Sequence, residues 1–147
     1  MQASTRYTIA IHICIYLNYK GNKLTTSQTI SESVKTNPVV IRRLLPLLKK
    51  RDIVGSVAGA NGGFFLARPA SEISLWDIYL AVRDDHFFNK PKVNDDCIVS
   101  SNLADLVDDI YTEAELSMKS VLNKKNIGQL TSRLKKLLRE KEAALVC

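Results

Sequence analysis

The spacing of apolar residues changes along the chain, and each spacing predicts a different element. Residues 5–19 (TRYTIAIHICIYLNY) are apolar on nearly every side, and Gly21 follows closely. This pattern predicts a buried first helix that ends before the glycine. Thr25 or Thr26 can then cap a short second helix, TSQTISESV, whose two large apolar residues lie one turn apart.

A third helix is predicted over residues 37–50. Asn37 is a good cap, and Pro38 occupies the first helical position, where proline is tolerated. Pro46 removes one backbone hydrogen bond, so the helix either bends there or loses its regular geometry earlier. Two short helices joined by a tight turn, with arginines on the outer face of the second, are typical of a helix-turn-helix. The positions i, i+3, i+4 and i+7 form a core-facing stripe of Ile41, Leu44, Leu45 and Leu48.

Residues 57–69 (VAGANGGFFLARP) hold three glycines within a short stretch. Strand-forming residues flank the glycines at 53–57 and 64–66, and glycine adopts the positive φ angles that hairpin turns require. A phosphate-binding loop would instead need a helix after the glycines and a Lys-Ser or Lys-Thr pair, and neither follows here. The pattern therefore predicts a β-hairpin.

The second half of the chain predicts three more helices and one loop. Ser74 can cap a fourth helix, whereas residues 84–101 lack periodicity and are interpreted as a loop. The last helix has one apolar face that begins at Ile127. The preceding helix carries a narrow seam, at alternating steps of four and three, that suits a partner helix: Leu103, Val107, Ile110, Ala114 and Val121.

These elements predict a mainly α fold with a small β-hairpin. We expect a winged helix-turn-helix domain over residues 1–83 and a loop over 84–101. Residues 102–147 would then form a helical dimerisation region that packs back on the first domain.

The distribution of charge along the chain indicates a class of partner. The 147 residues carry a net charge of +6, and five cations fall within ten residues at 42–51, whereas acidic residues gather later. One half of the chain thus suits a polyanionic partner. No apolar run reaches the roughly 18 residues of a membrane span, and the first residues do not resemble a signal peptide. We therefore expect a cytoplasmic protein with no membrane partner.

The sequence offers few candidates for a catalytic residue, a disulfide or a metal site. Cys14, Cys97 and Cys147 lie far apart without a CxxC pair, which fits reduced thiols better than a disulfide scaffold or a zinc site. Residues 84–86 (DDH) are adjacent and cannot all converge on one ion, so no metal site is expected. No Ser-His-Asp order or pair of catalytic carboxylates stands out, so no catalytic residue is assigned and an enzyme is not expected.

Three stretches, together with the order of the elements, resemble the Rrf-two family of bacterial winged-helix transcription regulators. They are RYTIAIHI (6–13), TNPVVIRRLL (36–45) and GANGGFFLARP with the following ISLWDIYLAV (59–82). The resemblance covers almost the whole chain. The segment NPVVIRR is similar to the YwnA-like branch of the family in particular.

The resemblance implies a homodimeric, sequence-specific DNA-binding regulator, a repressor, on a palindromic double-stranded operator. The recognition helix 37–50 would enter the major groove, the wing 58–63 would lie beside it, and the seam from Leu103 would form the dimer contact. Which arginine contacts a base and which a phosphate stays open. Carried over by position, the DNA-binding residues are Ser27, Gln28, Asn37, Pro38, Val39, Arg42, Arg43, Ala60, Asn61 and Gly62.

Two departures from the family pattern change what is expected. Val57 and Ala58 stand where the wing usually carries a basic residue, so the wing would not grip phosphate by charge. Cluster-binding members place three cysteines close together in the loop, where this chain has only Cys97, so neither an iron–sulfur cluster nor another cofactor is expected.

Two questions stay open at this point. Cys97 is a candidate redox thiol, with a disulfide to Cys147 as a variant of that hypothesis, but the effector that the protein senses is unknown. The alternative function is a winged-helix module for protein assembly that binds nucleic acid only weakly and without sequence preference.

Overall fold

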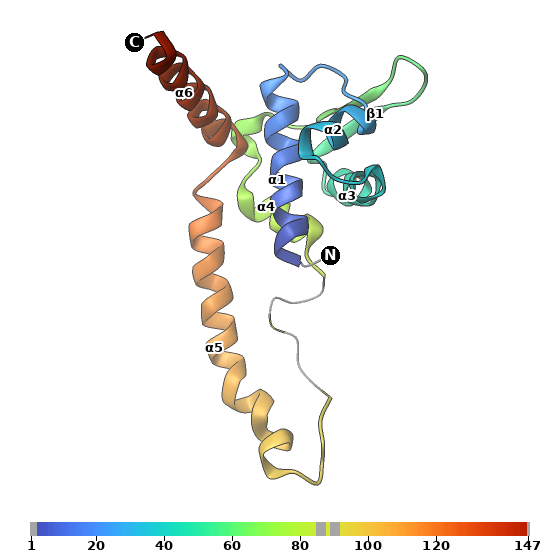
Figure 1. Cartoon of the computed structure of the whole chain (residues 1–147). Helices are drawn as coiled ribbons and strands as arrows, with labels where there is room; N and C mark the ends of the chain where they lie inside the picture. The colour runs from blue at the N-terminus through green and yellow to red at the C-terminus, as the bar shows by residue number, and fades with distance from the viewer. Residues whose placement is uncertain (1–2, 85–87, 89–91, 147) are drawn as a thin grey trace.

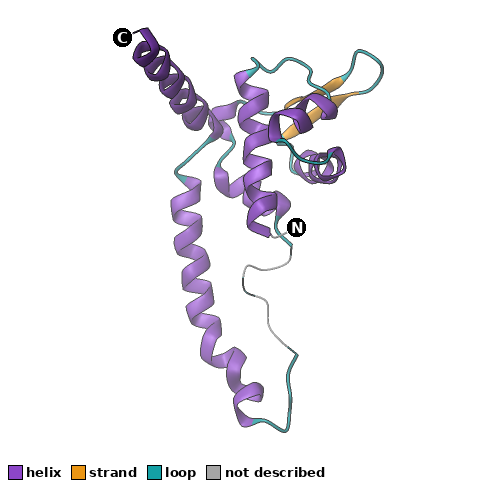
Figure 2. Cartoon of the chain, viewed as in Figure 1, coloured by secondary structure: helices purple, strands orange, loops and turns teal. Residues whose placement is uncertain are grey.

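The computed structural model describes residues 3–84, 88 and 92–146. A head of helices and one hairpin carries two C-terminal helices that extend away from it (Figure 1). This arrangement confirms the mainly α fold with a small β-hairpin (Figure 2). The elements are α1 (Ala3–Tyr19), α2 (Ser27–Val34), α3 (Pro38–Lys50), β1 (Val54–Val57), β2 (Gly63–Leu66), the 3-10 helix η1 (Ala70–Glu72), α4 (Leu75–Val82), α5 (Ile98–Asn123) and α6 (Ile127–Val146).

The central element of the head is α1, because it contacts α2, α3, α4, α6 and β2. Ile13, Cys14 and Leu17 of this helix are completely buried, as the apolar character of residues 5–19 predicted. The core residues of α3 and the start of α6 join them in one continuous cluster. Helix α3 therefore rests on the same core as the beginning of α6.

The helix-turn-helix forms where the caps predicted it. The Thr26 side chain accepts a hydrogen bond from the Thr29 amide, and α2 ends at Lys35 in a left-handed conformation. Asn37 Oδ1 then accepts from the Val39 amide at 2.9 Å, and Pro38 begins α3. Despite Pro46, α3 continues to Lys50 as one α-helix, in agreement with the predicted range 37–50, so of the two alternatives at this proline the earlier end is excluded. Pro46 is exposed, and its ring costs one backbone bond without displacing the buried stripe.

The hairpin is antiparallel, with Val54 opposite Leu66 and Val57 opposite Gly63. Its second strand also pairs with the segment between α1 and α2, since the Thr25 amide donates to the Phe64 carbonyl (3.1 Å) and the Phe64 amide donates to the Thr25 carbonyl (2.8 Å). The Asn22 side chain completes this attachment by bonding both the amide (2.6 Å) and the carbonyl (3.1 Å) of Leu66. The second strand of the wing is thus fixed to the segment between α1 and α2 at two points.

The fourth helix begins with a capping box, in which the side chains of Ser74 and Asp77 each bond the other's backbone amide. The next helix begins at Ile98, so residues 98–101 are helical and the predicted loop 84–101 is wrong at its end. The first turns of this helix carry polar side chains, so the apolar pattern did not reveal where it begins. Ser101 Oγ and Asn102 Nδ2 donate to the carbonyls of Cys97 (3.1 Å) and Ile98 (2.7 Å) in the preceding turn.

The last helix packs against α1 and η1 near its beginning. Ile127 is completely buried there, and Asn18 Nδ2 donates to Thr131 Oγ1 at 2.9 Å. Beyond this contact α6 extends away from the head (Figure 1). Among the described helices, none is both long and apolar enough to cross a bilayer.

Candidate nucleic-acid interface

The outer surface of α3 is divided into a ridge and a flank. Val39, Arg43, Pro46 and Lys50 are all exposed and follow one another at steps of four, three and four. On an α-helix this spacing forms a ridge along one face, opposite the buried stripe. The side chains on this ridge project farthest from the head and could reach the floor of a major groove.

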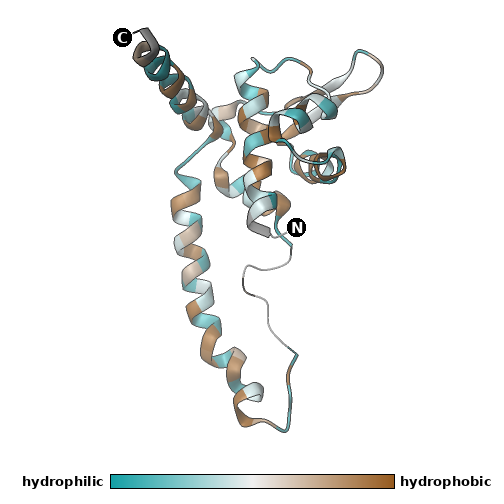
Figure 3. Cartoon of the chain, in the orientation of Figure 1, coloured by the Kyte–Doolittle hydropathy of each residue, from teal (hydrophilic) through white to brown (hydrophobic). Residues whose placement is uncertain are grey.

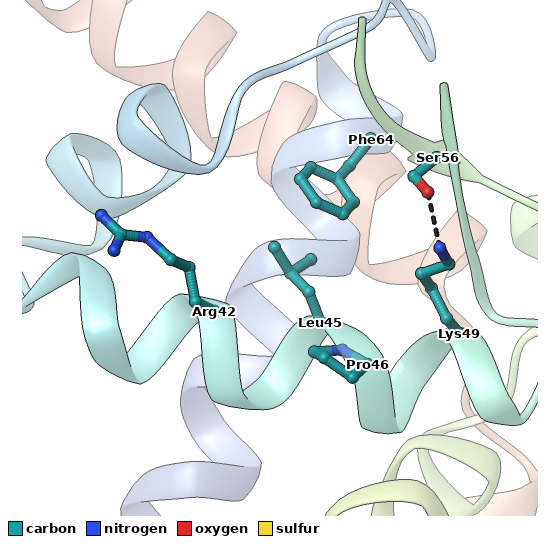
Figure 4. A pocket seen from close by; sticks show the side chains of 6 residues that line it. All are labelled: Arg42, Leu45, Pro46, Lys49, Ser56 and Phe64. Atoms are coloured by element: carbon teal, nitrogen blue, oxygen red, sulfur yellow. Dashed lines mark hydrogen bonds between the residues drawn. The ribbon is translucent and has the colours of Figure 1, made fainter. Parts of the chain in front are cut away.

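The flank of α3 faces the wing. Arg42 and Lys49 lie seven residues apart on this side, at the two ends of a groove whose floor includes Leu45, Pro46 and Phe64 (Figure 4). The groove has a volume of about 210 Å³. Lys49 Nζ donates across it to Ser56 Oγ on β1, at 2.6 Å. This bond links α3 directly to the wing.

The cations of α3 remain without acidic partners in the described part of the chain. Arg42, Arg43, Lys49, Lys50 and Arg51 are all exposed, and none belongs to an ion pair recorded between described residues. Five uncompensated positive charges therefore gather around α3, and such a patch attracts polyanions over several ångströms. Of the acidic residues that come later in the chain, five lie on α5: Asp105, Asp108, Asp109, Glu113 and Glu115.

The predicted contacts on α2 and at the start of α3 lie near these cations. Gln28 is exposed and bonds Glu32 Oε1 at 3.1 Å, whereas Ser27 is half-buried. Asn37 is exposed at the start of α3, where its Oδ1 is engaged by the cap. Val39, 43% exposed, follows it on the ridge.

The tip of the wing is small and uncharged. Gly59 has φ +105°, and the Gly62 amide bonds the Gly59 carbonyl at 3.1 Å. A Cβ on Gly62 would lie 2.0 Å from the Val57 carbonyl oxygen, so only glycine fits this turn. Ala60 and Asn61 are exposed at the tip, which presents backbone groups and one amide side chain.

Two residues of the groove were missed by the reasoning from sequence. The spacing of Arg42 and Lys49 would have placed both cations on one helix face, so Lys49 could have been found. Ser56 could not, because its role depends on how the hairpin packs against α3. The helical spacing from Val39 would likewise have placed Lys50 on the outer ridge.

The long helix α5 has two distinct faces. Its half-buried residues, including Tyr111, Glu115 and Leu122, lie on the side toward the head. An exposed apolar stripe runs along the helix beside this side, and Figure 3 shows hydrophobic residues recurring along the helix. Of the predicted seam residues, Val107 is half-buried, while the rest are exposed: Leu103, Ile110, Ala114 and Val121. Val99 and Leu106 extend this exposed stripe.

The described thiols do not come together. Cys14 lies in the core, where burial raises the pKa of its thiol to about 12. Cys97 is half-buried immediately before α5, and Cys147 lies outside the described residues, as do residues 85–87. Asp84 pairs with Arg6 at 2.9 Å. Within the described residues no group of three His, Cys, Asp or Glu side chains could hold a metal ion.

Comparison with known proteins identifies this architecture. The family model described as Rrf2, iron-dependent transcriptional regulator, matches residues 3–133. YwnA of Bacillus subtilis, named as an HTH-type transcriptional regulator, is 33% identical over 133 residues, which cover 89% of this chain and 98% of YwnA.

Solved structures agree with this match. A crystal structure titled as that of a DNA binding protein is 35% identical, with a TM-score of 0.67 over 85% of this chain and 97% of that one. CymR of B. subtilis, titled the global cysteine regulator, shares the fold at 21% identity, with a TM-score of 0.66 over 90% and 98% of the two chains. The chain therefore belongs to the Rrf2 family of transcriptional regulators.

Proposed function

We propose that this regulator is a repressor that binds a palindromic operator as a homodimer. The observation that carries the proposal is the set of uncompensated cations on α3, beside a wing that is fixed to the same core. The curated relative that covers most of the chain is named as a helix-turn-helix regulator, and a similar solved protein is titled as DNA-binding.

In this proposal α3 enters the major groove and the wing lies beside it. Gln28 and Ser27 would approach the DNA backbone at the start of α2, while the start and the ridge of α3 would face base edges. The tip of the wing, Ala60 to Gly62, would approach the duplex through its backbone, because it carries no cationic side chain. Glycine permits that close approach.

The experiment that tests this function is a selection of genomic fragments at several salt concentrations. Selective retention of a few fragments, with affinity falling steeply as salt rises, is expected, since phosphate contacts release counterions. Uniform weak retention of all fragments would instead favour the assembly module. Release of transcription in cells that lack the protein would support repression, whereas loss of transcription would identify an activator.

The exposed stripe of α5 supports the homodimer. The seam residues are spaced four, three, four, three and four positions apart, and this series is the same in both directions along the helix. They are Leu103, Val107, Ile110, Ala114, Ser117 and Val121. Two antiparallel copies would therefore place Leu103 opposite the partner's Val121 and Ile110 opposite the partner's Ala114.

A pair of matched variants tests this interface. Ile110 and Leu116 are 62% and 60% exposed on α5, but only Ile110 lies on the symmetric stripe. I110D should shift the protein from dimer to monomer in analytical ultracentrifugation, because each dimer would bury two new charges near its centre. L116D should leave the dimer intact. Equal behaviour of the two variants would contradict the proposed seam.

A redox or small-molecule signal is the third part of the proposal. Cys97 lies at the start of the helix that would join the two copies, so its oxidation could alter their relative position. If Cys97 is the sensor, oxidant should change operator affinity in the wild type and not in C97S. An identical response in both proteins would exclude this thiol.

The proposed function does not involve bound iron, although the family description refers to iron. Cys14 is buried in the core and Cys97 lies before α5, and the described residues offer no converging set of ligands. These residues do not fit a cluster held in the family's manner.

A further inference from the structure

We propose that the groove between α3 and the wing holds one stretch of DNA backbone. In this arrangement Arg42 and Lys49 each bind a phosphate, and the sugar between them lies on the apolar floor. The inference rests on the proposed DNA-binding function and deepens it, because it assigns separate tasks to two adjacent arginines.

The two ends of the groove are cationic. Arg42 and Lys49 are seven residues apart, about 10 Å along the helix, so their flexible side chains can reach neighbouring phosphates of one strand. Lys49 already extends across the groove to Ser56 Oγ, a neutral partner that orients the ammonium group without cancelling its charge. A phosphate arriving at this end would meet a positioned cation and a hydroxyl donor.

The floor between the cations is apolar. Leu45 is buried beneath it, Phe64 is half-buried, and Pro46 is exposed at its edge (Figure 4). Such a surface offers no hydrogen bonds with which to read a base edge, but it accommodates the C–H groups of a deoxyribose. Alternating cation, apolar floor and cation therefore complement the alternating phosphate, sugar and phosphate of a nucleic-acid strand.

Arg43 has a different environment. It lies on the outer ridge with Val39 and Lys50, away from the groove and the wing. An arginine that enters the major groove can donate two hydrogen bonds to guanine O6 and N7, which is a base-specific contact. The geometry thus assigns Arg43 to base reading and Arg42 to the backbone, and it resolves the choice that the sequence left open.

The test compares R42Q, K49Q and R43Q with the wild type on the selected operator and on an unrelated duplex. R42Q and K49Q should each weaken binding to both duplexes to a similar extent. In each variant the fall of log affinity with log salt should become less steep by about 0.9. R43Q should weaken binding to the operator roughly ten- to hundredfold more than binding to the unrelated duplex. K135Q, which removes an exposed charge on α6, is the matched control and should change neither measurement.

A chemically modified probe then locates the contact. The operator is prepared with single neutral methylphosphonates at successive backbone positions. At the position opposite Lys49, the substitution should weaken wild-type binding about as much as K49Q does, and it should have little further effect on K49Q. All four substituted side chains are exposed, so unchanged thermal unfolding confirms that the variants fold.

The outcomes separate the two proposals. If the wild type selects no fragment at all, the DNA-binding function itself fails. If selection is intact, an unchanged salt slope in K49Q, or a loss of selectivity in R42Q instead of R43Q, overturns the backbone groove alone.

Discussion

The attachment of the wing to the head can be tested at Gly63, the first residue of β2. Gly63 is buried, and a Cβ built on it would lie 2.7 Å from the Thr25 amide nitrogen and 3.0 Å from the Leu24 carbonyl carbon. Both are backbone atoms of the segment between α1 and α2, which cannot rotate away as a side chain can. The variant Gly63→Ala must therefore push the wing and this segment apart.

The cost of this separation can be worked out from the contacts. The bridge between Thr25 and Phe64 consists of two backbone hydrogen bonds, 3.1 and 2.8 Å long, each worth about 1 kcal/mol in net stability. Forcing an additional methyl group into a packed interior adds about 1–3 kcal/mol. We expect G63A to lose about 3 kcal/mol of unfolding free energy, which for a chain of this size lowers the Tm by roughly 10 °C.

The matched control is Gly55→Ala in the neighbouring strand. Its Cβ would lie 2.5 Å from the Phe65 ring, but this contact is with a side chain that can move. Thermal unfolding followed by circular dichroism should therefore show a much smaller loss for G55A, under about 1 kcal/mol. A Tm for G63A within a few degrees of the wild type, or a larger loss for G55A, would refute the argument.

Three further outcomes are expected. Alkylating reagents should leave Cys14 unmodified in the native protein, since burial raises the pKa of its thiol to about 12; peptide mass mapping that finds it labelled before unfolding would contradict this. Burial lowers the His12 pKa, so unfolding favours protonation and stability should fall as the pH drops below about 6.5. H12Q should reduce that loss in denaturation at pH 7 and pH 5. Protein purified without oxygen should be colourless, and visible charge-transfer absorption would show a cluster.

Local chemistry predicted much of the head. The caps at Asn37 and Ser74 act on the residues immediately after them, and the apolar stripe of α3 depends only on helical periodicity. These signals are contained in short stretches of sequence. The helix-turn-helix, the hairpin and the fourth helix therefore follow from the pattern, with differences of a few residues at their ends.

The sequence left questions open, or missed contacts, where other parts of the chain decide the outcome. The effect of Pro46 on α3 was open, and the buried residues on both sides of it hold the helix against the core through Lys50. Asn22 has no pattern that would reveal its two bonds to Leu66, since the partner lies 44 residues away. Ser56, which lines the groove, was missed for the same reason. Tertiary packing, not local preference, positions these groups.

The head and the long helix are joined by backbone hydrogen bonds as well as by packing. The Leu75 amide donates to the Lys125 carbonyl at 2.9 Å, and the Ile127 amide donates to the Ile73 carbonyl at 3.0 Å. The turn between α5 and α6 is thereby fixed to the residues that begin α4. Arg83, just beyond α4, adds an ion pair of 2.8 Å to Glu115 on α5.

These contacts place constraints on any signal in the proposed dimer. Because α5 is attached to the head at both ends of α4, a shift of α5 at the dimer seam would move the whole head rather than bend it. A small rotation at the seam would then change the separation of the two recognition helices, and a palindromic operator tolerates little change in that separation. An inducing signal therefore needs only to alter how two copies of α5 pack, and α3 itself can keep its structure.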